Sequence, residues 1–177
     1  MNSYEFKTKP FDHQLSVIRE TWDKDYYALF MEMGTGKTKV VIDTMAILHE
    51  ANKINAALII APKGVFDNWV RKEIPAHLPA RIARNIVRWQ PNITQKFHDE
   101  LEPFVLDSFE GLKLFVMNVE AFSTSKGVQI AKVFLKKNPK NMVIVDESTT
   151  IKNRKASRTK NIIALQNLSE YRRILTG

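Results

Sequence analysis

The chain of 177 residues contains no cysteine. This excludes disulfide bridges, thiol nucleophiles, iron–sulfur clusters and cysteine-based zinc sites. Its four histidines, at positions 13, 49, 77 and 98, are scattered, and no two of them stand at a spacing typical of a metal site. We therefore expect no structural metal.

Long hydrophobic runs are also missing. No stretch approaches the roughly 18 consecutive apolar residues that a membrane-spanning helix requires. The first residues, MNSYEFKTKPF, lack the apolar run of a secretion signal. Because 44% of the residues are hydrophobic, the chain can still bury a core. We expect a single domain over residues 1–177 that is cytoplasmic and has no membrane partner.

Acidic residues are fewer than basic ones, 19 against 27, which gives a net charge of +8. The excess is local: residues 98–110 carry five acids and no lysine or arginine, whereas residues 152–160 carry five basic residues and no acid. A basic surface favours a polyanionic partner, because phosphate contacts gain affinity from counterion release. A solvated basic helix face explains the same pattern.

Short apolar segments rich in β-forming residues alternate with longer segments of helical period. This pattern is typical of an α/β fold with a mostly parallel central sheet and helices on both faces. We expect strands, each buried on both faces, at 26–31, 57–61, 85–89, 112–117, 142–145 and 172–175. We expect helices at 11–22, 37–51, 66–73, 93–106, 125–137 and 155–168, with Pro62, Pro75 and Pro79 among the prolines that fall between elements.

A glycine-rich loop follows the first expected strand and opens a helix. It consists of Gly34, Thr35, Gly36, Lys37 and Thr38. Glycines let backbone N–H groups close around a phosphate, and the helix start adds partial positive charge. Lys37 is expected to reach the β and γ phosphates of ATP, and Thr38 to offer its hydroxyl to Mg²⁺. The strict pattern has a further glycine where this chain has Met31, so the motif alone also allows an ordinary glycine-rich helix start.

Two adjacent carboxylates directly follow the apolar segment 142–145. Asp146 is the candidate for holding Mg²⁺, and Glu147 is the candidate general base that positions the attacking water. Open α/β sheets place their ligands at the carboxyl ends of strands. Taken alone, such a pair is usually a strand leaving the core, but together with the loop it predicts a P-loop NTPase with Lys37, Asp146 and Glu147 as catalytic residues.

Together these segments resemble the superfamily 2 helicases, in particular the Swi/Snf-like branch of double-stranded DNA translocases. The resemblance covers nearly the whole chain. It is carried by the loop at 32–38, by PFDHQ at 10–14, by the APKGV segment followed by Asn68, Trp69 and Glu73, and by the run from Asp146 to the final Leu-Thr-Gly.

The resemblance implies that the chain is the first of two RecA-like lobes of an ATP-driven DNA motor. Gln14 would then recognise the adenine base. Basic residues would contact the backbone of duplex DNA without reading its sequence; the candidates are Lys63, Lys152, Arg154 and Lys155. Thr149 and Thr176 would couple hydrolysis to the DNA.

Two departures from the family pattern bear on activity. Ser148 and Thr149 replace the Ala-His that usually follows Asp-Glu, so coupling is expected to be altered. The second lobe, which supplies an arginine to the ATP site in the family, is absent from the chain. Because such an arginine contributes several orders of magnitude in rate, we expect the chain alone to hydrolyse little or no ATP.

Other functions remain open at this point. The chain could be a non-hydrolysing nucleic-acid or protein-binding module that uses ATP as a ligand or not at all. A small kinase or an assembly ATPase is a further possibility, against which the Trp69/Glu73 motif and the final Leu-Thr-Gly argue. Trp69 itself is expected to be a core aromatic. The basic residues do not distinguish DNA from RNA, or duplex from single strand. The absence of added N-terminal domains favours a bacterial or phage protein.

Overall fold

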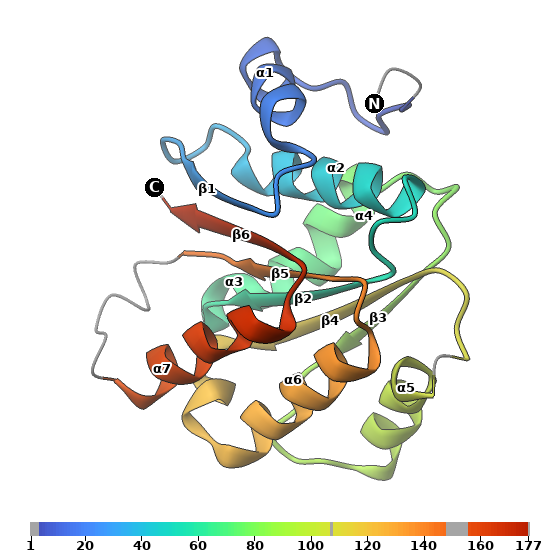
Figure 1. Cartoon of the computed structure of the whole chain (residues 1–177), viewed down its shortest axis with the longest axis vertical. Coiled ribbons are helices and arrows are strands. Elements are labelled where there is room, and N and C mark those ends of the chain that lie inside the picture. The colour runs from blue at the N-terminus through green and yellow to red at the C-terminus, as the bar shows by residue number, and fades with distance from the viewer. Residues whose placement is uncertain (1–3, 107, 148–155, 177) are drawn as a thin grey trace.

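A computed structural model of the chain describes residues 4–106, 108–147 and 156–176. Its centre is a six-stranded sheet in which every neighbouring pair is parallel (Figure 1). The strands are β1 (Tyr26–Phe30), β2 (Ala56–Ala61), β3 (Arg84–Arg88), β4 (Leu112–Asn118), β5 (Asn141–Val145) and β6 (Tyr171–Thr176), in the order β1-β6-β5-β2-β4-β3. The expected α/β class and parallel sheet are confirmed.

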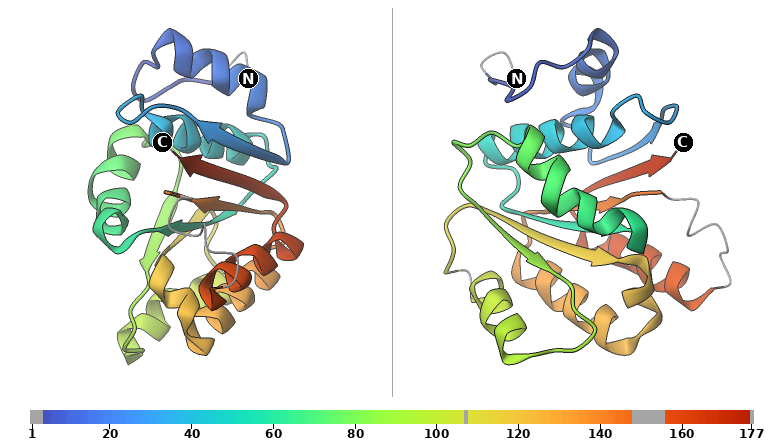
Figure 2. Two further views of the ribbon diagram at one scale, coloured as in Figure 1. Left: turned by 90° about the vertical axis from the view of Figure 1, so that its left-hand side faces the viewer. Right: turned by 180° about the vertical axis from the view of Figure 1, so that it is seen from behind.

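Helices cover both faces of this sheet (Figure 2). One layer contains α2 (Lys37–Glu50), α3 (Lys63–Asn68) and α4 (Ile74–His77), with α1 (Asp12–Thr21) lying against α2. The other layer contains α5 (Gln95–Val105), α6 (Ser125–Lys137) and α7 (Ser157–Ala164), with 3₁₀ turns at Val119–Ser123 and Leu165–Leu168. Among the described residues, no helix is long and apolar enough to span a membrane.

The core lies between the layers and is densest around the middle strands. Every residue of β2 and of β5 is buried, as are the first six of β4. The expectation of burial on both faces is wrong for β1, β3 and β6. The first two are edge strands, and Phe30 in β1 is 79% exposed. In β6 the exposed residue is Ile174, which borders a hollow in the surface.

Every expected strand is present, with its ends displaced by at most one residue. The helix expected at 66–73 differs more, because helical backbone runs from Lys63 to His77. A π-helical turn (Trp69–Glu73) joins α3 to α4, and the N–H of Ile74 donates to the carbonyl oxygen of Trp69, five residues back. Pro75 therefore lies inside α4, and the expectation that it falls between elements is wrong. The π-helical turn directly before Pro75 already departs from the ordinary bonding to the fourth residue back, as the bond between Ile74 and Trp69 shows, so a residue without an N–H is tolerated there.

Candidate functional site

Three chain segments that the sequence singled out meet at one edge of the sheet. The ends of β1, β6 and β5 lie side by side, with Phe30 opposite Thr176 and Val145 opposite Ile174. The glycine-rich loop follows β1, and Asp146 follows β5. Lys37 opens the helix that follows this loop. The sheet topology thus brings the loop, Asp146 and Thr176 together, as the sequence predicts.

The loop has the backbone of an anion-binding turn. Gly34 and Gly36 have φ angles of 78° and 82°, in the left-handed region that favours glycine. Gly36 is the N-cap of α2, and no side chain caps this helix or places an acid in its first turn. No acidic side chain of the first turn of α2 therefore competes for its first N–H groups, and the positive end of a 14-residue helix faces the loop. This arrangement suits a phosphate group.

Lys37, the first residue of α2, folds back over the loop. Its Nζ donates to the carbonyl oxygens of Met31 at 2.7 Å and Glu32 at 2.9 Å. These acceptors carry only partial charge, whereas phosphate oxygens are anionic and make stronger hydrogen bonds with an ammonium group. Lys37 is thus held at the loop by bonds that a bound phosphate can replace.

Gln14 in α1 is buried against the same loop, with 2% of its surface exposed. Its Oε1 accepts from the N–H of Phe11 at 3.0 Å, and its Nε2 donates to the carbonyl oxygen of Thr35 at 2.9 Å. A side chain at Gly36 would overlap Gln14 Nε2. The structure therefore brings Gln14 to the loop as a brace, a contact that sequence reasoning missed, and adenine recognition stays a prediction.

Asp146 is the buried carboxylate of the site, with 6% of its surface exposed. Burial raises its pKa above the ordinary value, while hydrogen bonds from the Trp69 indole and the Glu147 backbone, together with the charge of Lys37, act in the opposite direction. Trp69 Nε1 donates to Asp146 Oδ2 at 2.7 Å. The expectation that Trp69 is a core aromatic is confirmed, since it is fully buried. Its bond to Asp146 was missed, although a buried indole N–H usually has an acceptor.

Glu147 has a φ of 53°, a left-handed conformation that is uncommon for a residue with a Cβ. Such backbone costs on the order of 1 kcal/mol and is concentrated at functional sites. Glu147 is half-buried and directly follows the metal-binding candidate. The unusual backbone agrees with a functional position, and its role as general base stays a prediction.

The other predicted site residues are placed as follows. Thr38 is half-buried in the first turn of α2, and Thr176 ends β6 beside Phe30. Lys63 is exposed as the first residue of α3, just beyond the carboxyl end of β2. Four candidates lie outside the described residues: Thr149, Lys152, Arg154 and Lys155.

The donors at this edge suit one kind of cation. No group of three or more histidine, aspartate or glutamate side chains able to hold a metal occurs in the described part of the chain. A cation bound by the Thr38 hydroxyl and the Asp146 carboxylate would therefore complete its shell with phosphate oxygens and water. Mg²⁺ has this preference, since it is commonly bound through one or two protein oxygens together with substrate phosphates.

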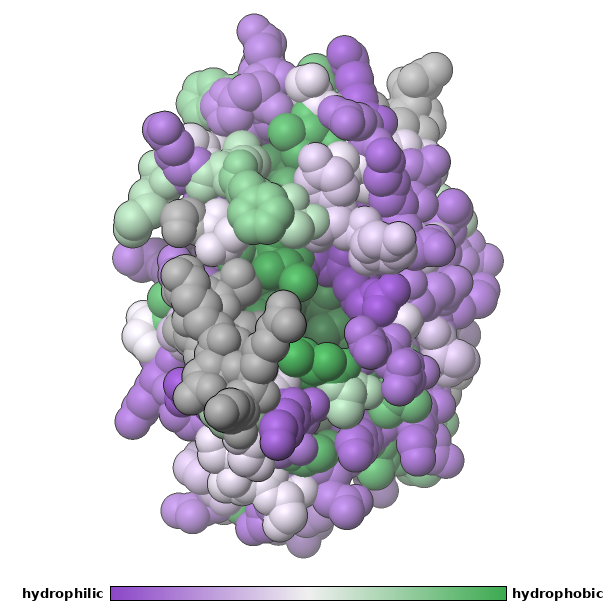
Figure 3. Space-filling model, turned by 60° about the vertical axis from the view of Figure 1, so that its left-hand side comes forward, coloured by the Kyte–Doolittle hydropathy of each residue, from purple (hydrophilic) through white to green (hydrophobic). Residues whose placement is uncertain are grey.

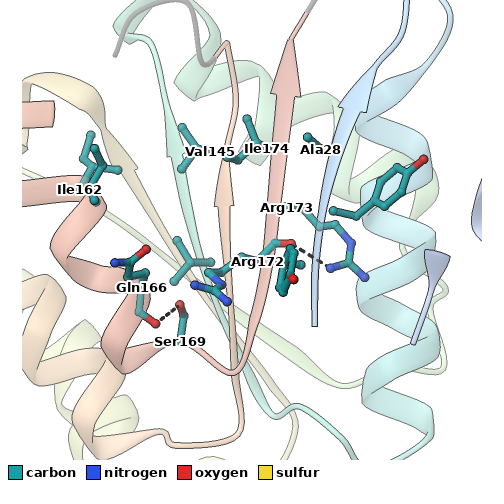
Figure 4. Close-up of a pocket in the computed structure, with 12 residues that line it drawn as sticks. Ala28, Val145, Ile162, Gln166, Ser169, Arg172, Arg173 and Ile174 are labelled. Carbon is teal, nitrogen blue, oxygen red and sulfur yellow. Dashed lines mark hydrogen bonds between the residues drawn. The ribbon is translucent and has the colours of Figure 1, made fainter. Parts of the chain in front are cut away.

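The side of the molecule toward which the strands point is hollowed and carries hydrophobic side chains (Figure 3). Phe30 and Met33, which flank the start of the loop, are 79% and 83% exposed. A separate apolar hollow of about 390 Å³ lies between β1, β5, β6 and α7, bordered by Ala28, Val145 and Ile174 (Figure 4). Its lining also includes Arg172, Arg173, Gln166 and Ser169, but neither the glycine-rich loop nor Asp146, so this hollow is distinct from the site at the loop.

Comparisons with known proteins agree with this geometry. The sequence profile of the SNF2-related domain matches residues 18–177. The ATP-dependent helicase fft1 of Schizosaccharomyces pombe is 27% identical over 146 residues, which are 82% of this chain and 14% of that protein. The chromatin-remodeling ATPase INO80 of the same organism is 31% identical over 160 residues, 82% of this chain and 9% of that protein. The chain thus spans less than a fifth of the length of these relatives.

A solved structure shows the same fold. The SWI2/SNF2 ATPase core of Sulfolobus solfataricus, determined in complex with double-stranded DNA, superposes on the whole of this chain with a TM-score of 0.67 and 18% identity. The match covers 34% of that protein chain. The observed sheet and its two helical layers therefore share the fold of part of that protein.

Proposed function

The chain belongs to the SNF2-related domain family, and on this basis we propose that it is the ATP-binding N-terminal lobe of a nucleic-acid-dependent ATPase, either a helicase or a double-stranded DNA translocase. One observation carries the proposal. The glycine-rich loop and Asp146 meet at the carboxyl edge of the sheet, because they follow β1 and β5, the two strands that flank β6. This is the arrangement that phosphoryl transfer from ATP requires.

The residues of the loop would bind the triphosphate. Backbone N–H groups at the start of α2 would donate to the phosphate oxygens, and Lys37 would exchange its bonds to Met31 and Glu32 for bonds to the β and γ phosphates. Thr38 and Asp146 would hold Mg²⁺, which supplies charge neutralisation at the phosphates when bound. Glu147 would orient the attacking water and take up its proton.

A second RecA-like lobe would complete this site. The family relatives are several times longer than the chain, which leaves room for such a lobe in them. Phe30 and Met33 beside the loop are largely exposed, and a second lobe at this edge would cover them. An arginine from the second lobe would stabilise the charge that develops during hydrolysis, and the chain alone would then turn over ATP slowly or not at all.

Duplex DNA is the proposed track. The SWI2/SNF2 core from Sulfolobus solfataricus was determined with double-stranded DNA, and the chain carries a net charge of +8. Contacts from Lys63, Lys152, Arg154 and Lys155 to phosphates would be independent of base sequence. The proposed setting is the cytoplasm of a bacterium or a phage-infected cell.

Coupling between hydrolysis and DNA is assigned to Thr149 and Thr176. Thr176 stands at the end of β6, between the strand that leads to the loop and the strand that leads to Asp146. A hydroxyl in this place can exchange hydrogen bonds when nucleotide enters or leaves. The non-hydrolysing binding module is not favoured, since the curated relatives are named as helicases and remodeling ATPases.

Steady-state ATP hydrolysis tests this proposal. Turnover is measured with Mg²⁺, with and without duplex DNA, and with Lys37→Ala as the blank that removes contaminating ATPase activity. We expect a folded chain to show no turnover above the blank. DNA-stimulated turnover that is lost in Lys37→Ala would mean that the chain completes an ATPase site without a second lobe. Equal turnover in the wild-type chain and in Lys37→Ala would come from contaminating ATPases and not from the loop.

A further inference from the structure

The hydrogen bond between Trp69 and Asp146 links two segments that are 77 residues apart in the chain. Both side chains are buried, and the bond joins a neutral donor to a carboxylate at 2.7 Å. Hydrogen bonds to charged groups are stronger than those between neutral groups, and they gain further strength where water is excluded. The indole is thus a substantial restraint on the orientation of the Asp146 carboxylate.

The sequence fixes Trp69 in this place through local structure. Trp69 begins the π-helical turn, whose wide hydrogen bond runs from the Ile74 N–H to the Trp69 carbonyl. The Asn68 side chain donates to Glu73 Oε1 at 3.0 Å across the same turn. Pro75 follows directly, and its missing N–H excludes an ordinary helical bond at that residue. π-helical turns inside helices are frequently found at functional sites.

The backbone of Asp146 is held by the sheet. Strands β2 and β5 are neighbours, and the N–H of Asp146 donates to the carbonyl oxygen of Ile60 at 2.8 Å. Because α3 and the π-helical turn follow β2 directly, they lie over the strand that pairs with β5. The indole and the carboxylate are therefore fixed by different elements, and neither needs to move to make the bond.

We propose that Trp69 is a positioning residue of the nucleotide site. Its indole N–H donates to Oδ2 of Asp146 and thereby fixes the rotation of the carboxylate group. This rotation determines which carboxylate lone pairs face a cation bound at the loop. The inference rests on the proposed function, because it assumes that Asp146 acts on Mg²⁺. Outer-shell partners of this kind orient metal-binding carboxylates, and their removal typically weakens metal binding 10- to 100-fold. The Asn68-Trp69 pair and Glu73, which belong to one sequence motif, then serve the ATP site.

Trp69 fluorescence reports on the surroundings of the indole that makes this bond. The chain has three tryptophans, so the double variant Trp22→Phe, Trp89→Phe leaves Trp69 as the sole indole. We expect its emission to change on addition of ATP with Mg²⁺, and to change much less on addition of ATP with EDTA. Emission that stays constant while calorimetry shows Mg-ATP bound would overturn the inference and leave the proposed function intact. Absence of any ATP binding would overturn both.

A second measurement separates positioning from packing. Trp69→Phe keeps an aromatic ring but removes the N–H. Trp89→Phe is the matched control, since Trp89 is also buried but follows β3, at the sheet edge opposite to β1, where it packs against Phe97. For each protein the Kd for ATP is measured with Mg²⁺ and with EDTA. We expect Trp69→Phe to reduce the gain in affinity from Mg²⁺ by about tenfold, with the Kd in EDTA unchanged and the control unaffected.

The opposite pattern would contradict the inference. A ring that only fills the core would, when replaced, weaken ATP binding equally with Mg²⁺ and with EDTA. If Mg²⁺ increased the ATP affinity of Trp69→Phe as much as that of the wild-type chain, Trp69 would likewise have no positioning role. If Trp69→Phe fails to fold, the emission of the double variant still decides the question, because that protein keeps the Trp69–Asp146 bond.

Discussion

The amide of Gln14 donates to the carbonyl oxygen of Thr35 at 2.9 Å, and this bond ties α1 to the glycine-rich loop. Nε2 of His13 is also within hydrogen-bond distance of the Thr35 carbonyl oxygen, at 3.1 Å. Binding at the loop therefore depends on the position of α1 as well as on the loop itself. Nucleotide that moves the Thr35 carbonyl must also change the contacts of Gln14.

Gly36→Ala tests this relation. A Cβ at position 36 overlaps Gln14 Nε2, so the variant breaks the bond to Thr35 in addition to straining a left-handed backbone. Gly34→Ala is the matched control, because Gly34 has a similar φ but no atom within 4 Å of the added Cβ. We expect both variants to lose about 1 kcal/mol in the free energy of unfolding, with a further loss in Gly36→Ala. Thermal and urea unfolding measure the difference.

Repeating the pair in a Gln14→Ala background isolates the contact. Without Gln14 the overlap disappears, so the difference between the two alanine variants should shrink to within error. A difference that persists in this background would show that Gln14 does not brace the loop.

The buried Arg173 is expected to fix the other end of α1. One nitrogen of its guanidinium donates to the Thr21 carbonyl at 2.8 Å and another to the Arg172 carbonyl at 2.8 Å, and burial lowers its pKa to about 10. Arg173→Met should lower the free energy of unfolding by about 2–3 kcal/mol, since it removes the hydrogen bonds that a buried, charged donor makes to these carbonyl oxygens. The control is Arg172→Met, which loses mainly a cation–π contact with Tyr26 and should cost under about 1 kcal/mol. Equal losses in urea unfolding would contradict this assignment.

Asp43 should make stability depend on pH. Burial raises its pKa from 3.8 to about 6, although the hydrogen bond and charge of Lys39 act to lower it. The folded state thus binds this proton more tightly than the unfolded chain, so its contribution to stability is fully present below pH 4 and is lost as the pH rises through 6. The measurement is urea unfolding of wild type and Asp43→Asn from pH 4 to pH 7.5.

The comparison with Asp43→Asn removes the contributions of all other carboxylates. We expect the stability of wild type relative to this variant to decline as the pH rises. A relative stability that rises over this range would mean that the bond to Lys39 outweighs burial, and that the pKa of Asp43 lies below 3.8 in the folded protein.

Glu147 should show a conflict between stability and activity. Its φ of 53° is strained for any residue with a Cβ. Glu147→Gly and Glu147→Ala remove the same carboxylate, but only glycine relieves the backbone, so Glu147→Gly should unfold at the higher urea concentration, with an advantage of about 1 kcal/mol. Both variants should bind ATP and fail to hydrolyse it in the assembled two-lobe enzyme. Equal stability of the two variants would show that the backbone is not strained.

The sequence predicts those parts of the molecule that depend on local pattern. Strand positions follow from short apolar runs, and the loop and Asp146 follow from their place at strand ends. The π-helical turn could not be predicted in this way, because Pro75 reads as a helix boundary when the bond between Ile74 and Trp69 is unknown. The exposure of Ile174 depends on which helices reach β6, a property of the layers and not of the strand.

The contacts around the site were the least predictable features. Gln14 with Thr35, Trp69 with Asp146 and Arg173 with Thr21 all join residues at least 21 positions apart. Each requires the topology of the sheet before the two partners are known to be neighbours. Composition could still have pointed to them, since an indole N–H, an amide or a guanidinium placed among apolar residues must find a partner when it is buried.

Isothermal calorimetry of ATP binding tests the central claim most directly. The chain is titrated with ATP in Mg²⁺ and in EDTA, and Lys37→Ala is titrated in parallel after circular dichroism has shown that it is folded. The account predicts saturable binding of one ATP that is tighter with Mg²⁺ and weakened at least tenfold in Lys37→Ala, because the ammonium is the one loop side chain that carries a full charge to the phosphates. A folded chain that binds no ATP, or that binds it equally well without Lys37, would contradict it.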